Sequence, residues 1–299
     1  MNNIVTFSHL RWDFVYQRPQ HLLTRLAKRY AVTYIEEPKC VEDCSPHLHV
    51  RFPADRLTVI TPVTPCSSPG FHDDQMPLIR PLIRNWLRES HSFGEIAWLY
   101  TPMALPLIYD MGPGLTVYDC MDELSKFRFA PESLTLLERE LLELADVVFT
   151  GGPSLYNFKK QMHPNVHCFP SSVDAEHFGR ARFSQCDPPD QVQIPHPRLG
   201  FFGVIDKRID LELLRSLAEM RPSWQFVMVG PVVKIDEQVL PRNPNIHYLG
   251  SKDYSQLPDY LAGWDVCLLP FALNDSTEFI SPTKTLEYMA AERQIVSTP

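Results

Sequence analysis

Short apolar runs alternate with helix-like stretches along this 299-residue chain, and this alternation limits the fold more than any other feature. An apolar run too short for a helix predicts a strand, and apolar residues that recur every three or four positions predict a helix. In the first half we predict strands at residues 4–7, 31–36, 96–100, 115–119 and 147–150, and helices at 19–29, 131–145 and 154–161. Strands that alternate with helices indicate a parallel, doubly wound α/β sheet.

The same alternation restarts after a polar stretch. The second half predicts strands at 199–205, 225–229, 246–249, 266–270 and 295–297, and helices at 209–220, 254–263 and 282–291. Residues 181–198 between the halves contain four prolines, which indicates a linker. We therefore expect two Rossmann-like domains, 1–180 and 199–299, that face a cleft. Ligands of such sheets bind beyond the carboxyl ends of the strands.

Charge and cysteine content exclude several classes of protein. A formal net charge of -8 argues against general nucleic-acid binding. The seven cysteines are odd in number and form no C-x-x-C pair, so we expect neither a zinc site nor a disulfide framework. The N-terminus lacks a signal-peptide pattern, and no apolar run approaches the length of a membrane span. The expected compartment is the cytoplasm.

The segment from Phe279 to Pro299 places a lysine at the start of a predicted helix. Ser281 is a good N-cap and Pro282 a good first helical residue, so Lys284 falls in the first turn. A cation there is disfavoured by the helix dipole, by roughly 0.3–1 kcal/mol at an exposed position. A bound diphosphate would remove this conflict, because backbone N–H groups and the lysine charge converge on one point.

Glu287 follows Lys284 by one helical turn and shares its face, so it can accept hydrogen bonds from ribose hydroxyls. The apolar residues of this helix are expected to face the other way, into a core: Leu286, Met289 and Ala290. The alternative is a surface helix on which Lys284 and Glu287 form an ordinary exposed pair.

Five motifs follow one another along the chain. They are Arg11-Trp12-Asp13 with Gln17-Arg18-Pro19-Gln20-His21, then Tyr118-Asp119-Cys120-Met121-Asp122-Glu123, then Pro170-Ser171-Ser172-Val173-Asp174, then Gly200-Phe201-Phe202-Gly203, and finally Ser281 to Ala291. In this order and spacing they resemble a GT-B glycosyltransferase of the group 1, or family 4, type, and its bacterial branch in particular. In this resemblance the motif at 170–174 corresponds to the interdomain hinge.

The resemblance implies transfer of a sugar from a nucleotide diphosphate-sugar, held by the second domain, to a saccharide or lipid-linked acceptor held by the first. It implies stereochemical retention and a role in cell-surface polysaccharide or glycolipid assembly. The donor-binding residues that it implies are Gly203, Lys207 or Arg208, Gly230, Ser281, Thr283, Lys284 and Glu287. For the two charges at 207–208, solvated loop residues are the alternative.

In the first domain the resemblance directs attention to two groups. Trp12, Asp13, Arg18 and His21 would close over the donor or frame the acceptor, unless Arg18 is a structural ion-pair partner. Asp119 and Asp122 follow a strand, so a carboxylate there can orient the acceptor hydroxyl or act as base, with a helix cap as the alternative for Asp122. The chain has no D-x-D motif, so we expect no metal and no other cofactor. Basic residues and a helix N-terminus would stabilise the leaving group.

The chain also departs from the family pattern. The first of two glutamates usually eight residues apart is replaced by Phe279, with Glu278 one position early. Glu292 stands where a glycine usually ends the helix, at a cost of about 1 kcal/mol if the left-handed geometry is kept. Relatives continue beyond Pro299, so we expect the second domain to be incomplete.

Two further alternatives stay open from the sequence. The arginine-rich stretch 78–88 can lie on an anionic membrane surface or be a buried connector. The same scaffold also suits a nucleotide-sugar epimerase or a non-catalytic sugar-nucleotide-binding protein.

Overall fold

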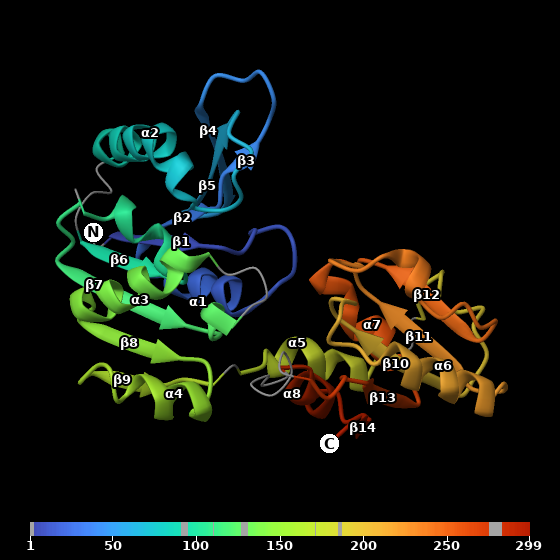
Figure 1. Cartoon of the computed structure of the whole chain (residues 1–299). Coiled ribbons are helices and arrows are strands. Elements are labelled where there is room, and N and C mark those ends of the chain that lie inside the picture. Colours follow the sequence, from blue (N-terminus) through green and yellow to red (C-terminus); the bar gives the residue numbers. More distant parts are fainter. Residues whose placement is uncertain are drawn as a thin grey trace. The chain divides into compact units, whose positions relative to one another are not determined.

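The computed structural model describes residues 3–90, 95–109, 111–126, 131–170, 172–184, 187–274 and 283–299. The chain forms two compact units, residues 1–170 and 171–299 (Figure 1). Both are α/β units built on parallel sheets, as the alternation predicted. No helix within the described ranges is long and apolar enough to cross a bilayer.

The first unit contains one twisted sheet. Its strands are β1 (Asn3–Ser8), β2 (Ala31–Glu36), β3 (Lys39–Cys40), β4 (His47–Ala54), β5 (Leu57–Thr64), β6 (Ile96–Leu99), β7 (Leu115–Cys120), β8 (Val147–Thr150) and β9 (Val166–Cys168). Its helices are α1 (Arg18–Leu26), α2 (Met76–Glu89), α3 (Glu132–Leu144) and α4 (Pro153–Lys159), with 3₁₀ turns at Asp73–Gln75, Pro102–Leu107 and Leu124–Lys126. The strand order is β3-β5-β2-β1-β6-β7-β8-β9, and β4 pairs with β5. Only the β4–β5 pairing is antiparallel in the described part of this sheet.

Side chains alternate between the two faces of this sheet, so each face has its own core. Helix α1 packs on one face through Leu23, against Tyr34 and Trp98. Helices α2, α3 and α4 contribute to the core of the other face, as do Leu48 and Val50 of β4.

Helix α2 covers the stretch for which a membrane surface and a buried connector were the alternatives. Its apolar residues Ile79, Ile83 and Leu87 are almost fully buried in the core. These side chains are therefore already used in packing and are not free to enter a bilayer, which favours the connector.

The second unit contains a five-stranded parallel sheet in the order β12-β11-β10-β13-β14. The strands are β10 (Arg198–Phe202), β11 (Gln225–Val229), β12 (Ile246–Gly250), β13 (Val266–Leu269) and β14 (Gln294–Ser297). The helices are α5 (Ala175–Gly179), α6 (Leu211–Met220), α7 (Leu257–Ala262) and α8 (Thr283–Ala290), with 3₁₀ turns at Arg180–Arg182, Glu237–Val239 and Tyr254–Gln256.

The stretch expected as a linker packs onto the second unit instead. Ile194 is buried, and the fully buried Gln191 accepts a hydrogen bond from the Trp264 indole at 2.8 Å and donates one to the Tyr260 carbonyl at 3.0 Å. Proline content indicates irregular backbone but says nothing about packing, so the linker prediction was wrong. The chain divides at residues 170/171, inside the motif that corresponds to the family's hinge.

Helix α8 corrects the expected orientation of the C-terminal segment. Leu286 and Met289 are exposed, whereas Tyr288 is fully buried and Ala290 is buried. Lys284 and Glu287 are partly buried and lie on the same side of the helix as Tyr288. The charged pair therefore faces the protein, because the large aromatic ring of Tyr288 sets which side packs. Ser281 and Pro282 lie outside the described residues.

The end of α8 keeps the left-handed geometry although it has no glycine. Glu292 has a φ of 56°. Its N–H donates to the Met289 carbonyl at 2.9 Å, and the N–H of Arg293 donates to the Tyr288 carbonyl at 3.1 Å. This pair of hydrogen bonds is the Schellman motif. A side chain at this φ costs about 1 kcal/mol relative to glycine.

We therefore expect Glu292→Gly to raise the free energy of unfolding by roughly 0.5–1 kcal/mol, measured by urea denaturation. The exposed ion pair between Glu292 and Arg182 (2.9 Å) is lost, but such pairs contribute little. The control is Glu219→Gly on the exposed side of α6, where glycine should cost roughly 0.5–1 kcal/mol. Loss of stability in both variants would contradict the strain at residue 292.

Candidate functional site

The second unit presents its candidate site where the strand order reverses. Strands β10 and β13 are neighbours, and the chain runs from β10 to β11 on one side and from β13 to β14 on the other, so a crevice is expected at their carboxyl ends. Gly203 directly follows β10, and Gly230 directly follows β11. Helix α8 comes after β13 in the sequence and brings Lys284 to the same edge.

Both glycines are required by close approach and by backbone conformation. Their φ angles are 141° and 142°, which other residues rarely adopt. A Cβ on Gly230 would lie 1.9 Å from the Gly203 carbonyl oxygen, and a Cβ on Gly203 would lie 2.2 Å from Cε of Lys284. The floor of the site is therefore main chain, with the lysine side chain laid directly across it.

Lys284 is a cation in a desolvated position. Its ammonium lies 5.8 Å from the centre of the Phe201 ring. Burial lowers the pKa of Lys284, an effect that the neighbouring Glu287 opposes and that Arg208 reinforces. No ion pair of Lys284 occurs among the residues that the structure describes. A bound anion would stabilise the charged form.

Glu287 is the acidic partner of this site. Burial raises the pKa of Glu287 to about 7, against the lowering effect of Lys284. Its carboxyl group is therefore close to half protonated near neutral pH, so it can both donate and accept hydrogen bonds. A carboxyl group of this kind can bind the hydroxyl groups of a ligand, whereas a carboxylate in a surface ion pair mainly contacts its cation.

Of the two basic residues after β10, Arg208 is the one whose charge acts on Lys284. The carboxylate of Asp206 holds its guanidinium, with Nε–Oδ1 at 2.9 Å and Nη2–Oδ2 at 2.8 Å. Lys207 is exposed, and its backbone carbonyl accepts a hydrogen bond from the Asn274 side chain at 3.4 Å. Thr283 is the first described residue of α8.

In the first unit the structure pairs two residues that the sequence placed 101 positions apart. Arg18, the first residue of α1, contacts Asp119 of β7 with Nη2–Oδ1 at 2.9 Å and Nε–Oδ1 at 3.1 Å. Its Nη1 donates to the Phe169 carbonyl at 2.5 Å. The structural ion pair that we left open for Arg18 is therefore present.

Asp119 corrects the expectation of an accessible base. Its side chain is fully buried. Burial raises the pKa of Asp119, while Arg18 acts to lower it. In the described residues this buried carboxylate contacts the guanidinium of Arg18 rather than open surface.

The remaining predicted residues of the first unit do not converge on one point. Trp12 is buried against Tyr34, with ring centres 5.0 Å apart, so it belongs to the core rather than to a mobile loop. His21 packs edge-on against Tyr16 at 4.6 Å. Asp122 is exposed and precedes a 3₁₀ turn, where its carbonyl accepts the Leu124 N–H at 3.0 Å.

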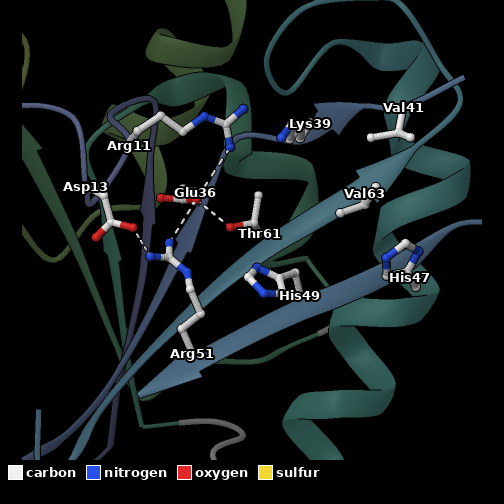
Figure 2. Close-up of a pocket in the computed structure, with 10 residues that line it drawn as sticks. All are labelled: Arg11, Asp13, Glu36, Lys39, Val41, His47, His49, Arg51, Thr61 and Val63. Atoms are coloured by element: carbon white, nitrogen blue, oxygen red, sulfur yellow. Dashed lines mark hydrogen bonds and ion pairs between the residues drawn. The ribbon is translucent and has the colours of Figure 1, made fainter. Parts of the chain in front are cut away.

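Asp13 lies at a cavity that the sequence reading missed. The cavity has a volume of about 730 Å³ and lies in the first unit (Figure 2). Its lining residues are Arg11, Asp13, Glu36, Lys39, Val41, His47, His49, Arg51, Thr61 and Val63. The available signal was the strict alternation His47-Leu48-His49-Val50-Arg51, which is typical of a strand with one polar face.

Comparison with known proteins finds similarity to one family in the second unit. Residues 196–299 match the family described as Glycosyl transferases group 1. The chain is 25% identical over 203 residues to the "Putative teichuronic acid biosynthesis glycosyltransferase TuaH" of Bacillus subtilis (strain 168). That alignment covers 61% of this chain and 50% of the relative, so the chain spans about half the length of the curated relative that it matches.

Solved structures share the fold over nearly the whole chain. The sucrose-phosphate synthase of Thermosynechococcus elongatus has a TM-score of 0.70 at 14% identity, covering 99% of this chain and 81% of that one. An E. coli trehalose-6-phosphate structure bound with UDP-2-fluoro glucose has a TM-score of 0.64 at 12% identity, covering 99% and 84%. The chain therefore has an α/β fold that resembles that of GT-B glycosyltransferases, and residues 196–299 are similar to the group 1 glycosyltransferase family.

The raised pKa of Glu287 predicts a pH dependence of stability. A folded-state pKa of about 7, above the ordinary 4.5, means that stability falls as pH rises from about 4.5 to 7 and then stays level. Glu287→Gln removes this loss, so relative to wild type the variant should gain roughly 1–3 kcal/mol between pH 5 and pH 8.

Urea unfolding at both pH values measures this change, with the exposed Glu219→Gln as the matched control. If the free energy of unfolding of Glu287→Gln differs from that of wild type by the same amount at pH 5 and pH 8, the carboxyl group is not desolvated.

Proposed function

We propose that this protein is a glycosyltransferase that moves a sugar from a nucleotide diphosphate-sugar to an acceptor during assembly of a cell-surface polysaccharide or glycolipid. The observation that carries the proposal is the position of Lys284. It is a partly buried cation, laid over a main-chain floor at the carboxyl edge of the sheet that matches the group 1 family.

The donor's diphosphate fits the environment of Lys284. Binding of an anion offsets the desolvation that lowers the pKa of this lysine. The N–H groups of the first turn of α8 and the nearby Arg208 add favourable charge at the same point. Gly203 and Gly230 carry no side chains, so a phosphate can approach the backbone closely. Glu287, one turn from Lys284, is in reach of the ribose hydroxyls.

We further propose that the reaction needs no metal ion and no other cofactor. In such a reaction the negative charge that develops on the leaving diphosphate is stabilised by fixed positive groups. Lys284 and Arg208 supply two such groups, and Asp206 fixes the guanidinium of the second. Retention of the sugar's configuration rests on the family resemblance alone.

We assign the acceptor to the first unit and the reaction to the cytoplasmic side of the membrane. The match to a protein described as a teichuronic acid biosynthesis glycosyltransferase supports a polysaccharide product. Because the apolar residues of α2 are buried, contact with an anionic bilayer would depend on its arginines. Arg18, held by Asp119, is a candidate contact for the sugar or phosphate at the carboxyl edge of the first sheet.

Calorimetric titration with UDP, GDP, dTDP and ADP, with and without magnesium, tests the donor site. We expect one nucleotide to bind selectively, with an affinity independent of magnesium. Lys284→Ala should weaken it roughly 10- to 100-fold, the range expected for a charge-assisted phosphate contact.

Two other variants make this titration specific. Lys207→Ala should have a much smaller effect on nucleotide affinity, since that side chain is exposed and is not among the charges that shift the pKa of Lys284. Arg215→Ala, on the exposed side of α6, is the control for loss of a positive charge. Selective binding that Lys284→Ala leaves unchanged would overturn the assignment of the diphosphate to this lysine.

A further inference from the structure

The cavity of the first unit is built by strand register. Strand β5 pairs with β4 so that His49 lies opposite Thr61 and His47 lies opposite Val63. On its other side β5 pairs with β3 so that Lys39 lies opposite Val63, and the Thr61 hydroxyl reaches Glu36 at the end of β2. Polar side chains from four strands therefore stand in adjacent rows on one face (Figure 2).

The opposite face of β4 explains why this arrangement is stable. Leu48 and Val50 alternate with the polar residues and pack against the core beneath. Because side chains alternate along a strand, His47, His49 and Arg51 all turn to the cavity side. Burial of Leu48 and Val50 therefore fixes which face of β4 points to the cavity.

Glu36 is the buried anchor of the cavity. Its side chain is 4% exposed. It lies 3.3 Å from Nη2 of Arg51 and 3.6 Å from Nη1 of Arg11, accepts the Thr61 hydroxyl, and accepts the Trp12 N–H at 2.8 Å. A buried carboxylate with this many partners holds two guanidinium groups in fixed positions.

The charges at the cavity do not cancel. Three permanent cations, Arg11, Lys39 and Arg51, face two carboxylates, Asp13 and Glu36. One positive charge is left over even when the histidines are neutral. Within the part of the chain that the structure describes, Lys39 has no ion-pair partner, and the exposed His49 ring has no hydrogen bond. The cavity thus has hydrogen-bond donors without a partner in the described residues. It also has a local excess of positive charge, although the net charge of the protein is -8.

We propose that this cavity binds an anionic saccharide, with the carboxylate or phosphate on the sugar contacting Lys39, His47 and His49. This inference rests on the proposed function, since the saccharide would be the acceptor. A volume of about 730 Å³ falls in the range of ligand sites and admits one or two sugar rings. Val41 and Val63 offer apolar surface to a ring face, and Glu36 is a positioning residue that acts through Arg11 and Arg51.

Titration calorimetry with trigalacturonate, glucose 1-phosphate and maltotriose tests this proposal. The first carries carboxylates, the second a phosphate, and the third no charge. We expect at least one anionic saccharide to bind and maltotriose not to, with binding weakened by 150 mM salt. The stronger of the two anionic ligands identifies the group that the cavity prefers. Binding of maltotriose as tight as that of the anionic ligands would overturn the proposal.

Variants of exposed residues assign this binding to the cavity. The double variant Lys39→Gln/His49→Gln should weaken it roughly tenfold or more, because two charge-assisted contacts are lost. Lys28→Gln is a matched control, since Lys28 is exposed on the same unit and does not line the cavity. Equal binding by the double variant and the control would refute the site.

Nucleotide titration of the same double variant separates the two proposals. The double variant should bind nucleotide as wild type does, which also shows that it is folded. If the wild-type protein binds an anionic saccharide but no nucleotide, the donor site is refuted and the anion site stands. If the wild-type protein binds nucleotide but binds the anionic saccharides no better than maltotriose, the anion site is refuted and the donor site stands.

Discussion

Parallel pairing of the strands is the constraint that brings distant residues together at the carboxyl edge of each sheet. Parallel strands bring all their carboxyl ends to one edge, so residues far apart in the sequence must meet there. Arg18 meets Asp119 in this way in the first sheet. In the second sheet Gly203 and Gly230 touch through their backbones, and Lys284 lies across the first of them. These two clusters follow from the sheet edge rather than from any single motif.

Gathering charged groups at such an edge removes them from water, and the two units compensate for this differently. In the first unit two arginines are held by carboxylates, Arg18 by the fully buried Asp119 and Arg51 by the buried Glu36. In the second unit the charged side chain of Lys284 remains desolvated, so its pKa is lowered. The first arrangement fixes geometry in advance. The second leaves a favourable interaction to be completed by an anion.

The alternation of apolar and helical segments predicted β1, β2, β6, β7 and β8 of the first sheet and all the described strands of the second, because burial on two faces gives parallel strands a strong apolar signal. Strand β4 was missed, since His47, His49 and Arg51 interrupt that signal with one polar face. The linker was misplaced for the opposite reason. Proline content at 181–198 reports backbone irregularity, whereas the contacts of Gln191 that pack this stretch are long-range and leave no local pattern.

The C-terminal helix shows where sequence reasoning reaches its limit. Spacing correctly placed Lys284 and Glu287 on one face, and the family pattern singled out Glu292 as the position of a left-handed residue if that geometry is kept. It could not decide which face packs inward, because Leu286 and Met289 are as apolar as a core residue while Tyr288 has a polar hydroxyl. The structure buries Tyr288, whose hydroxyl accepts the Phe202 N–H at 3.3 Å. Burial of this aromatic ring sets which side of α8 packs inward, and Lys284, on the same side, lies against Gly203.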